Sequence, residues 1–161
     1  MTPHTNDTRI VRFEPSILRD LADHAAAAYP LEACGALVGA GGHVRVALPL
    51  PNRDARAPEI GFAVGPRDYL RVEAEADAAG LALLGFWHSH PDGLALPSAA
   101  DRARAWPGLL TVIVAVTGGE PDEISAWQLE SGDAPFRELP VEDGLALVST
   151  LGRAAAGGLR C

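Results

Sequence analysis

The stretch that decides the fold reads LALLGFWHSHPDGLALPSAAD and spans residues 81–101. Its first part, Leu81–Trp87, is almost entirely apolar, which is typical of a strand buried on both faces. His88-Ser89-His90 follows without a break, and Pro91–Pro97 is a turn-rich loop that leads into a short helix from Ser98 to Ala105. We therefore predict a buried strand that ends in two histidines, with a helix starting nearby.

The flanking sequence predicts two longer helices and several short strands. One helix runs from Pro15, with Ser16 as its N-cap, to Pro30, and the other runs from Pro66 to Gly80. Further strands are predicted at Arg9–Phe13, Ala33–Ala40, Val44–Leu48, Ile60–Val64, Leu109–Val116 and Ile124–Glu130, with another candidate at Phe136–Leu139. The resulting order β-α-β-β-β-α-β-α-β-β indicates the α/β class, a mixed sheet with helices packed against it.

Length and composition fit one globular domain. The chain has 161 residues, of which 48% are hydrophobic and 21% charged, and its formal net charge is −8. We expect a single domain over residues 1–140 and a weakly patterned tail over 141–161. All 13 basic residues are arginines, scattered without a cluster, so we expect no nucleic-acid partner. The absence of lysine excludes Schiff-base and P-loop chemistry.

The sequence favours a reducing compartment. Its two cysteines, Cys34 and Cys161, form no C-x-x-C pair, and the polar, proline-interrupted start shows no apolar signal segment. No apolar run reaches the ~20 residues of a membrane span. We therefore expect a cytoplasmic protein with no membrane partner. The sequence carries no signal for an oligomeric state.

A metal site is indicated by two histidines and a carboxylate. His88 and His90 share one face of the predicted strand, because side chains two residues apart point the same way. Asp101 follows in the first turn of the next helix. Two histidines and one carboxylate leave the fourth zinc position open to water, and zinc lowers the pKa of that water to about 7. Two alternatives remain open: H-x-H can be incidental, and Asp101 can simply help Ser98 to cap its helix.

Such a site also needs a base that does not bind the metal. Glu32 is the candidate, since it follows Pro30 at the start of a buried strand, where a desolvated glutamate requires a reason. The alternative is an ordinary surface glutamate.

The order of these residues, Glu32 followed by H-x-H-x7-S-x2-D at residues 88–101, is similar to the motif of the JAMM (MPN+) metalloprotease family. The similarity extends through Tyr29–Gly35, the Phe62 segment and Gly85–Pro91, and it covers about Arg9 to Glu130. It implies the MPN (JAB1/MPN) fold, a single-domain mixed β-sheet flanked by helices and distantly like cytidine deaminases.

The resemblance also implies roles for the motif residues. His88, His90 and Asp101 would bind one zinc ion that carries the catalytic water. Glu32 would act as general acid and base, and Ser98 would stabilise the oxyanion.

Members of that family cut the amide or isopeptide bond after the C-terminal Gly-Gly of ubiquitin or a ubiquitin-like protein. The chain resembles the compact bacterial-type members, the sulfur-carrier (CysO-cysteine-type) peptidases, so the expected substrate is a ThiS- or MoaD-type sulfur carrier that loses a cysteine or a C-terminal extension. Alternatives are a deubiquitinase-like isopeptidase acting on ubiquitin-like conjugates, a noncatalytic MPN scaffold, and a RadC-like protein. A diglycine has no side chains, so it can thread a narrow cleft and pair with a sheet edge.

Overall fold

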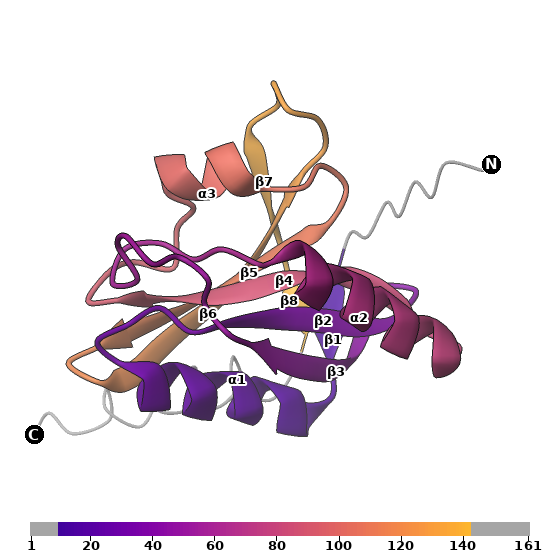
Figure 1. Cartoon of the computed structure of the whole chain (residues 1–161), viewed down its shortest axis with the longest axis horizontal. Coiled ribbons are helices and arrows are strands. Elements are labelled where there is room, and N and C mark those ends of the chain that lie inside the picture. Colours follow the sequence, from indigo (N-terminus) through magenta and orange to yellow (C-terminus); the bar gives the residue numbers. More distant parts are fainter. Residues whose placement is uncertain (1–9, 143–161) are drawn as a thin grey trace, which may run out of the picture.

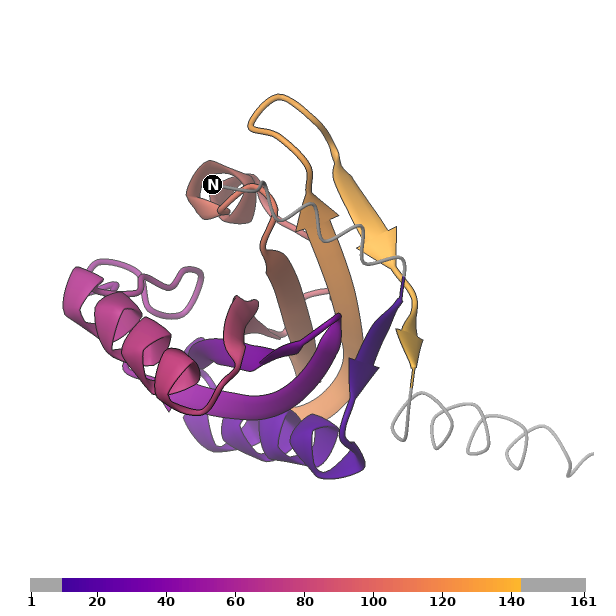
Figure 2. The same cartoon turned by 90° about the vertical axis from the view of Figure 1, so that its right-hand side faces the viewer.

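The computed structural model describes residues 10–142, which form one curved mixed sheet with helices on both faces (Figures 1 and 2). The helices are α1 (Pro15–Ala28), α2 (Pro66–Ala78) and α3 (Ala99–Arg104). The strands are β1 (Val11–Phe13), β2 (Cys34–Ala40), β3 (His43–Leu50), β4 (Ala82–Pro91), β5 (Leu110–Thr117), β6 (Glu120–Leu129), β7 (Phe136–Leu139) and β8 (Val141–Glu142). Within the described part, the sheet has eight strands in the order β7-β6-β5-β4-β2-β3-β1-β8.

The centre of the sheet is formed by β4, which pairs antiparallel with β2 and parallel with β5. Since parallel strands are normally covered on both faces, this position explains the unbroken apolar run at the start of β4. The free edges of the sheet are β7 and β8, and neither is adjacent to β4.

Helices α1 and α2 cover opposite faces of the sheet. Alternate side chains of β2 show this: Leu37 packs in the core with α1, whereas Ala36 and Val38 pack in the core with α2. Each helix starts with a proline at its first position, where the missing N–H costs nothing. Gly80, with φ of +68°, follows the end of α2 and lets the chain turn into β4.

Two predictions about local structure were wrong. The predicted strand at Ile60–Val64 is an irregular loop, because side chains rather than a neighbouring strand satisfy much of its backbone. Asn52 accepts a hydrogen bond from the Ala63 N–H at 3.2 Å and donates to the Gly61 carbonyl at 2.9 Å. Helix α1 begins at Pro15 with Glu14 as its cap, so Ser16 lies inside the first turn and caps nothing.

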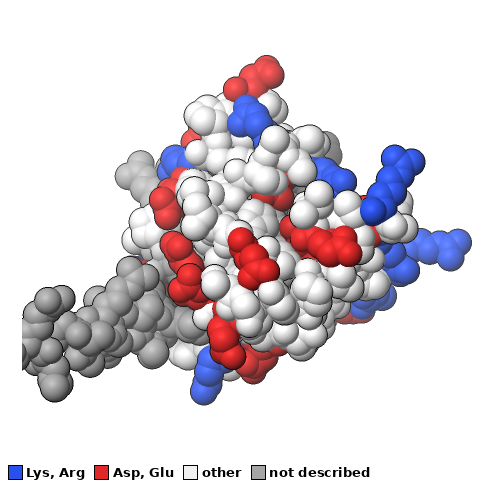
Figure 3. Space-filling view, turned by 90° about the vertical axis from the view of Figure 1, so that its left-hand side faces the viewer, with Lys and Arg blue, Asp and Glu red and all other residues white. Residues whose placement is uncertain are grey.

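Other expectations concern the chain ends and the surface. Val141–Glu142, which we expected in the tail, form β8 and pair with β1. The rest of the tail, including Cys161, lies outside the described residues. No helix in the described part is long and apolar enough to cross a membrane. On the face shown in Figure 3, acidic side chains gather near the centre and basic ones lie mostly toward the margin, so this face carries no continuous basic surface.

Candidate metalloprotease active site

The structure brings the three predicted metal ligands together at the end of β4. His88 and His90 project from the strand, and Asp101 projects from the first turn of α3. His88 Nε2 lies 2.9 Å from Asp101 Oδ1, and His90 Nε2 lies 3.1 Å from Asp101 Oδ2. The two Nε2 atoms are 3.0 Å apart. Three candidate ligands from two elements therefore converge on one point.

Asp101 also caps its helix, and the cap is compatible with the predicted ligand role. The Ser98 N–H donates to Asp101 Oδ2 at 2.7 Å, and Ser98 Oγ accepts from the Asp101 N–H at 3.1 Å. This capping box fixes the carboxylate at the helix start, where it faces the two imidazoles. Ser98 itself is exposed, and since its Oγ is the acceptor in the cap, its hydroxyl hydrogen is available to another acceptor.

Neighbouring groups orient the imidazoles. His90 Nδ1 lies 2.7 Å from the Leu94 carbonyl oxygen, which can only accept, so Nδ1 carries a hydrogen and Nε2 is directed at the site. His88 stacks on Phe62, with ring centroids 4.4 Å apart and an interplanar angle of 20°. The Phe62 carbonyl in turn accepts a hydrogen bond from Arg104 at 2.6 Å. The irregular loop at 60–64 thus supports a ligand.

The donor set fits a divalent metal ion. Because His90 Nδ1 is bonded to the Leu94 carbonyl, its Nε2 faces the other two candidate ligands, and a cation placed between the three would be bound by all of them. Ligands about 2.0–2.1 Å from a tetrahedral zinc lie about 3.3 Å from one another, close to the separations found here. The hydrogen bond from His90 to a backbone carbonyl is the kind of outer contact that metal-bound histidines make.

Glu32 is buried beside this cluster. Its side chain is 5% exposed, and no hydrogen-bond partner for Oε2 is found among the described residues. The backbone is held firmly, because the Glu32 N–H donates to the Pro58 carbonyl at 2.8 Å and the Asn52 side chain donates to the Glu32 carbonyl at 3.2 Å. Burial raises the pKa of Glu32 to about 7, and the negative charge of Asp101 adds to this, while the positive charge of His90 opposes it. A surface glutamate is excluded.

The ligands respond differently to burial. Desolvation lowers the pKa of His88, which is 1% exposed. Desolvation also opposes a charge on His90, but hydrogen bonds to Asp101 and the Leu94 carbonyl outweigh it and raise the pKa of His90. For Asp101, burial is again the largest single influence and acts to raise the pKa. The hydrogen bonds and charges of the two histidines overcome it and hold the pKa of Asp101 well below its usual range.

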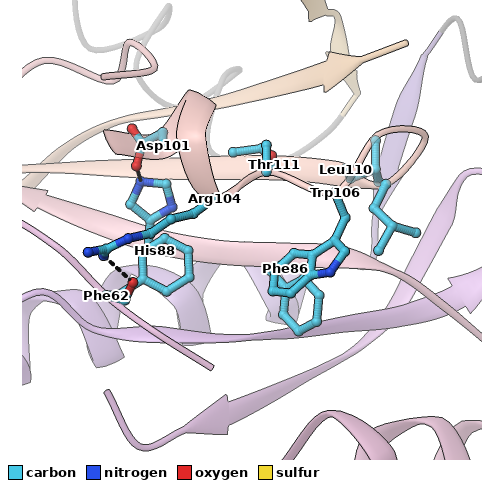
Figure 4. A pocket seen from close by; sticks show the side chains of 10 residues that line it. Phe62, Phe86, His88, Asp101, Arg104, Trp106, Leu110 and Thr111 are labelled. Atoms are coloured by element: carbon cyan, nitrogen blue, oxygen red, sulfur yellow. Dashed lines mark hydrogen bonds and ion pairs between the residues drawn. The ribbon is translucent and has the colours of Figure 1, made fainter. Parts of the chain in front are cut away.

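A narrow cavity of about 20 Å³ lies next to His88 and Asp101 (Figure 4). Phe62, Phe86 and Trp106 line it. Trp106 is 40% exposed, as expected for a residue that could line a substrate cleft. A volume of this size holds about one water molecule.

Three further residues, Cys34, Asn52 and Arg53, have structural roles. Cys34 is buried, and burial raises the pKa of its thiol to about 12, so it is an inert core cysteine. Asn52 directs its hydrogen bonds at the chain's own backbone, and Arg53 pairs with Asp68 at 3.1 Å.

The sequence analysis missed two contributors to the site. Phe62 was quoted only as part of a matching segment, and its stacking on His88 depends on an irregular loop that periodicity does not reveal. Ser89 was read only as the spacer between the histidines. Its fully buried Oγ accepts from the Ala33 N–H at 2.8 Å, next to Glu32. The sequence did contain a signal for this role: Ser89 lies between the two histidines, so its side chain must point to the opposite face of the strand.

The fold and the site together define a metalloprotease of the JAMM class. Residues 14–130 match the model of a family described as prokaryotic homologs of the JAB domain. The chain belongs to this family, which confirms the expected MPN fold, the enzyme class and the resemblance.

Similar proteins and a similar solved structure support the family assignment. The chain is 36% identical over 129 residues to a desampylase from Haloferax volcanii, covering 78% of this chain and 88% of the relative. It is 34% identical over 89 residues to a probable TtuB-protein conjugate cleaving protease from Thermus thermophilus, covering 55% and 59% respectively. Its fold is similar to that of AF2198, a JAB1/MPN domain protein from Archaeoglobus fulgidus, with a TM-score of 0.51, 17% identity and coverage of 84% and 99%.

Proposed function

We propose that the chain is a zinc-dependent isopeptidase that hydrolyses the bond after the C-terminal Gly-Gly of a ubiquitin-like protein. The observation that carries the proposal is the buried carboxylate of Glu32, whose Oε2 has no hydrogen-bond partner within residues 10–142, beside the convergent ligands His88, His90 and Asp101. Relatives named as a desampylase and a conjugate cleaving protease support this substrate class. This substrate class includes ThiS- and MoaD-type sulfur carriers. Such a carrier would be either the protein joined to a lysine or a carrier from which a C-terminal cysteine is released.

The residues divide the chemistry as follows. Zinc bound to His88, His90 and Asp101 would polarise the scissile carbonyl and acidify a water molecule. Glu32 accepts the proton of the attacking water and later donates it to the leaving amine. A group whose pKa lies near 7 suits both transfers at neutral pH. The Ser98 hydroxyl donates to the oxyanion that develops on the carbonyl.

The aromatic wall beside His88 supports a diglycine as the residue pair before the cut. Because aromatic rings fill the wall beside His88, a backbone without side chains reaches the ligands more easily than a bulky one. The free edges β7 and β8 are not adjacent to β4, so they offer no strand-pairing site next to the ligands.

Intact-mass analysis tests the proposal. Two substrates are compared: a ThiS- or MoaD-type carrier extended after Gly-Gly by cysteine, and the same carrier joined through Gly-Gly to a lysine side chain of a second protein. Each is incubated with wild type, with Glu32→Gln, and with wild type plus chelator. We expect zinc-loaded wild type to cut the bond to the lysine-linked protein. We expect no cleavage with Glu32→Gln or with chelator. Cleavage of the cysteine extension alone would favour the sulfur-carrier alternative, and cleavage of neither would refute the proposal.

A further inference from the structure

Two of the chain segments that carry the chemistry of this site are hydrogen-bonded to each other at two points. Residues 29–33, between α1 and β2, carry Glu32, and residues 88–92, at the end of β4, carry the two histidines. The first tie joins Ala33 to Ser89. The Ala33 N–H donates to Ser89 Oγ at 2.8 Å, and the Ser89 N–H donates to the Ala33 carbonyl at 3.0 Å.

The second tie joins the outer ends of the same segments. The Tyr29 hydroxyl donates to Asp92 Oδ2 at 2.7 Å. Asp92 is itself anchored, because its Oδ1 accepts from the Gly118 N–H at 2.8 Å and its N–H donates to the Val116 carbonyl at 2.6 Å. Asp92 has φ of +53°, a left-handed conformation that is uncommon for non-glycine residues and that aspartate adopts in turns. The turn between β5 and β6 thus holds Asp92, and Asp92 holds Tyr29.

These ties matter because Glu32 Oε2 has no hydrogen-bond partner of its own among the described residues. Where the carboxylate stands relative to the ligands therefore depends on the backbone on each side of it. Ala33 is fixed by Ser89 of a core strand. Pro58 and Asn52 hold the Glu32 backbone, so Tyr29 is the next point at which a side chain anchors the preceding residues. A proton transfer is sensitive to this placement, since a misplacement of about 1 Å can cost about a hundredfold in rate.

We infer that Tyr29 and Asp92 are positioning residues whose hydrogen bond sets the place of Glu32 against the metal ligands; this rests on the function proposed above. Asp92 is exposed, whereas Tyr29 is half-buried and packs against the core, and neither is one of the candidate metal ligands.

Tyr29→Phe tests the inference in the full-length zinc-loaded enzyme, since it removes one hydroxyl and keeps the ring. The matched control is Tyr69→Phe, because it removes the same hydroxyl from the other tyrosine of the chain. We expect kcat on the lysine-linked conjugate to fall about tenfold in Tyr29→Phe, with KM and zinc affinity within about twofold of wild type. The control should behave as wild type. An unchanged kcat, or an equal fall in both variants, overturns the inference, as does a loss that appears only in KM or zinc affinity.

A second measurement needs neither substrate nor metal, so it separates this inference from the proposed function. Amide hydrogen exchange is followed at Glu32 and Ala33 in wild type and in both variants. Exchange should be several-fold faster in Tyr29→Phe and unchanged in Tyr69→Phe. If wild type cleaves no conjugate but exchange is faster in Tyr29→Phe alone, the proposed function is wrong and the positioning role of the Tyr29–Asp92 hydrogen bond is supported. If exchange in Tyr29→Phe equals that of wild type, the tie is refuted whatever the activity.

Discussion

Replacing Glu32 by glutamine should make the metal-free protein more stable, and increasingly so as the pH rises. The carboxyl group has an ordinary pKa of 4.5 and a pKa of about 7 in the folded protein, because folding buries it. Below pH 4.5 it is neutral in both states and costs nothing. Between pH 4.5 and 7 the unfolded chain ionises first, so unfolding becomes easier as the pH rises. Glutamine stays neutral at every pH, so its burial does not lower the unfolding free energy as the pH rises.

The size of this effect follows from the shift in pKa. A shift of about 2.5 units corresponds to about 3 kcal/mol once the pH exceeds both values, since each unit is worth about 1.4 kcal/mol. Part of the penalty is already present at pH 5. The difference in unfolding free energy between Glu32→Gln and wild type should therefore widen by about 2 to 3 kcal/mol from pH 5 to pH 8. Any cost of burying an amide is the same at both pH values and cancels.

Urea denaturation with chelator at the two pH values measures this difference. Glu59→Gln is the matched control, because Glu59 is exposed and its desolvation on folding is small. Adding zinc should shrink the effect, since a nearby cation favours the carboxylate form. If the difference between Glu32→Gln and wild type is the same at pH 5 and pH 8 without metal, the carboxylate is not destabilised by burial, and the account of Glu32 as a base with a pKa near 7 fails.

Three further substitutions test other parts of the structure. His88→Ala should lose both zinc and turnover, whereas Glu32→Gln should keep zinc and lose only turnover, as measured by metal analysis and conjugate cleavage. Asn52→Ala should lower the unfolding free energy by about 2 to 3 kcal/mol in urea, because several backbone groups lose their partner; a loss below about 0.5 kcal/mol would show that water replaces it. Gly35→Ala should unfold at clearly lower urea concentration, since a Cβ there would lie 2.4 Å from the Leu48 carbonyl oxygen and from Trp87 Nε1; wild-type stability would contradict the close packing.

The central part of the fold was predictable because its signals are local. A long apolar run predicts a strand covered on both faces, and β4 lies at the centre of the sheet as expected. The prolines at 15 and 66 mark the helix starts correctly. The strand predicted at Ile60–Val64 failed because an apolar run does not reveal that the side chains of Asn52 and Arg104 will satisfy the backbone.

The candidate site was predictable for a different reason. The spacing of His88 and His90 fixes their common face, and the capping pattern fixes where Asp101 enters, so three residues could be placed from local rules. Glu32 could not be placed this way. It lies far from the ligands in the sequence, and its link to them passes through pairing of β2 with β4 and through Ser89, which no local pattern shows.

This division has a functional meaning. The ligands are placed by residues close to them in sequence, because both histidines lie on β4 and the Ser98 N–H donates to Asp101. Among the described residues Glu32 Oε2 has no hydrogen-bond partner, a state that folding tolerates only at a cost. Because burial destabilises the ionised carboxylate, Glu32 binds a proton more readily than an exposed glutamate does. Contacts made by other parts of the chain must therefore keep it in place. The weakest sequence signal therefore belongs to the residue that most depends on long-range contacts, and substitutions at those contacts should affect proton transfer before they affect metal binding.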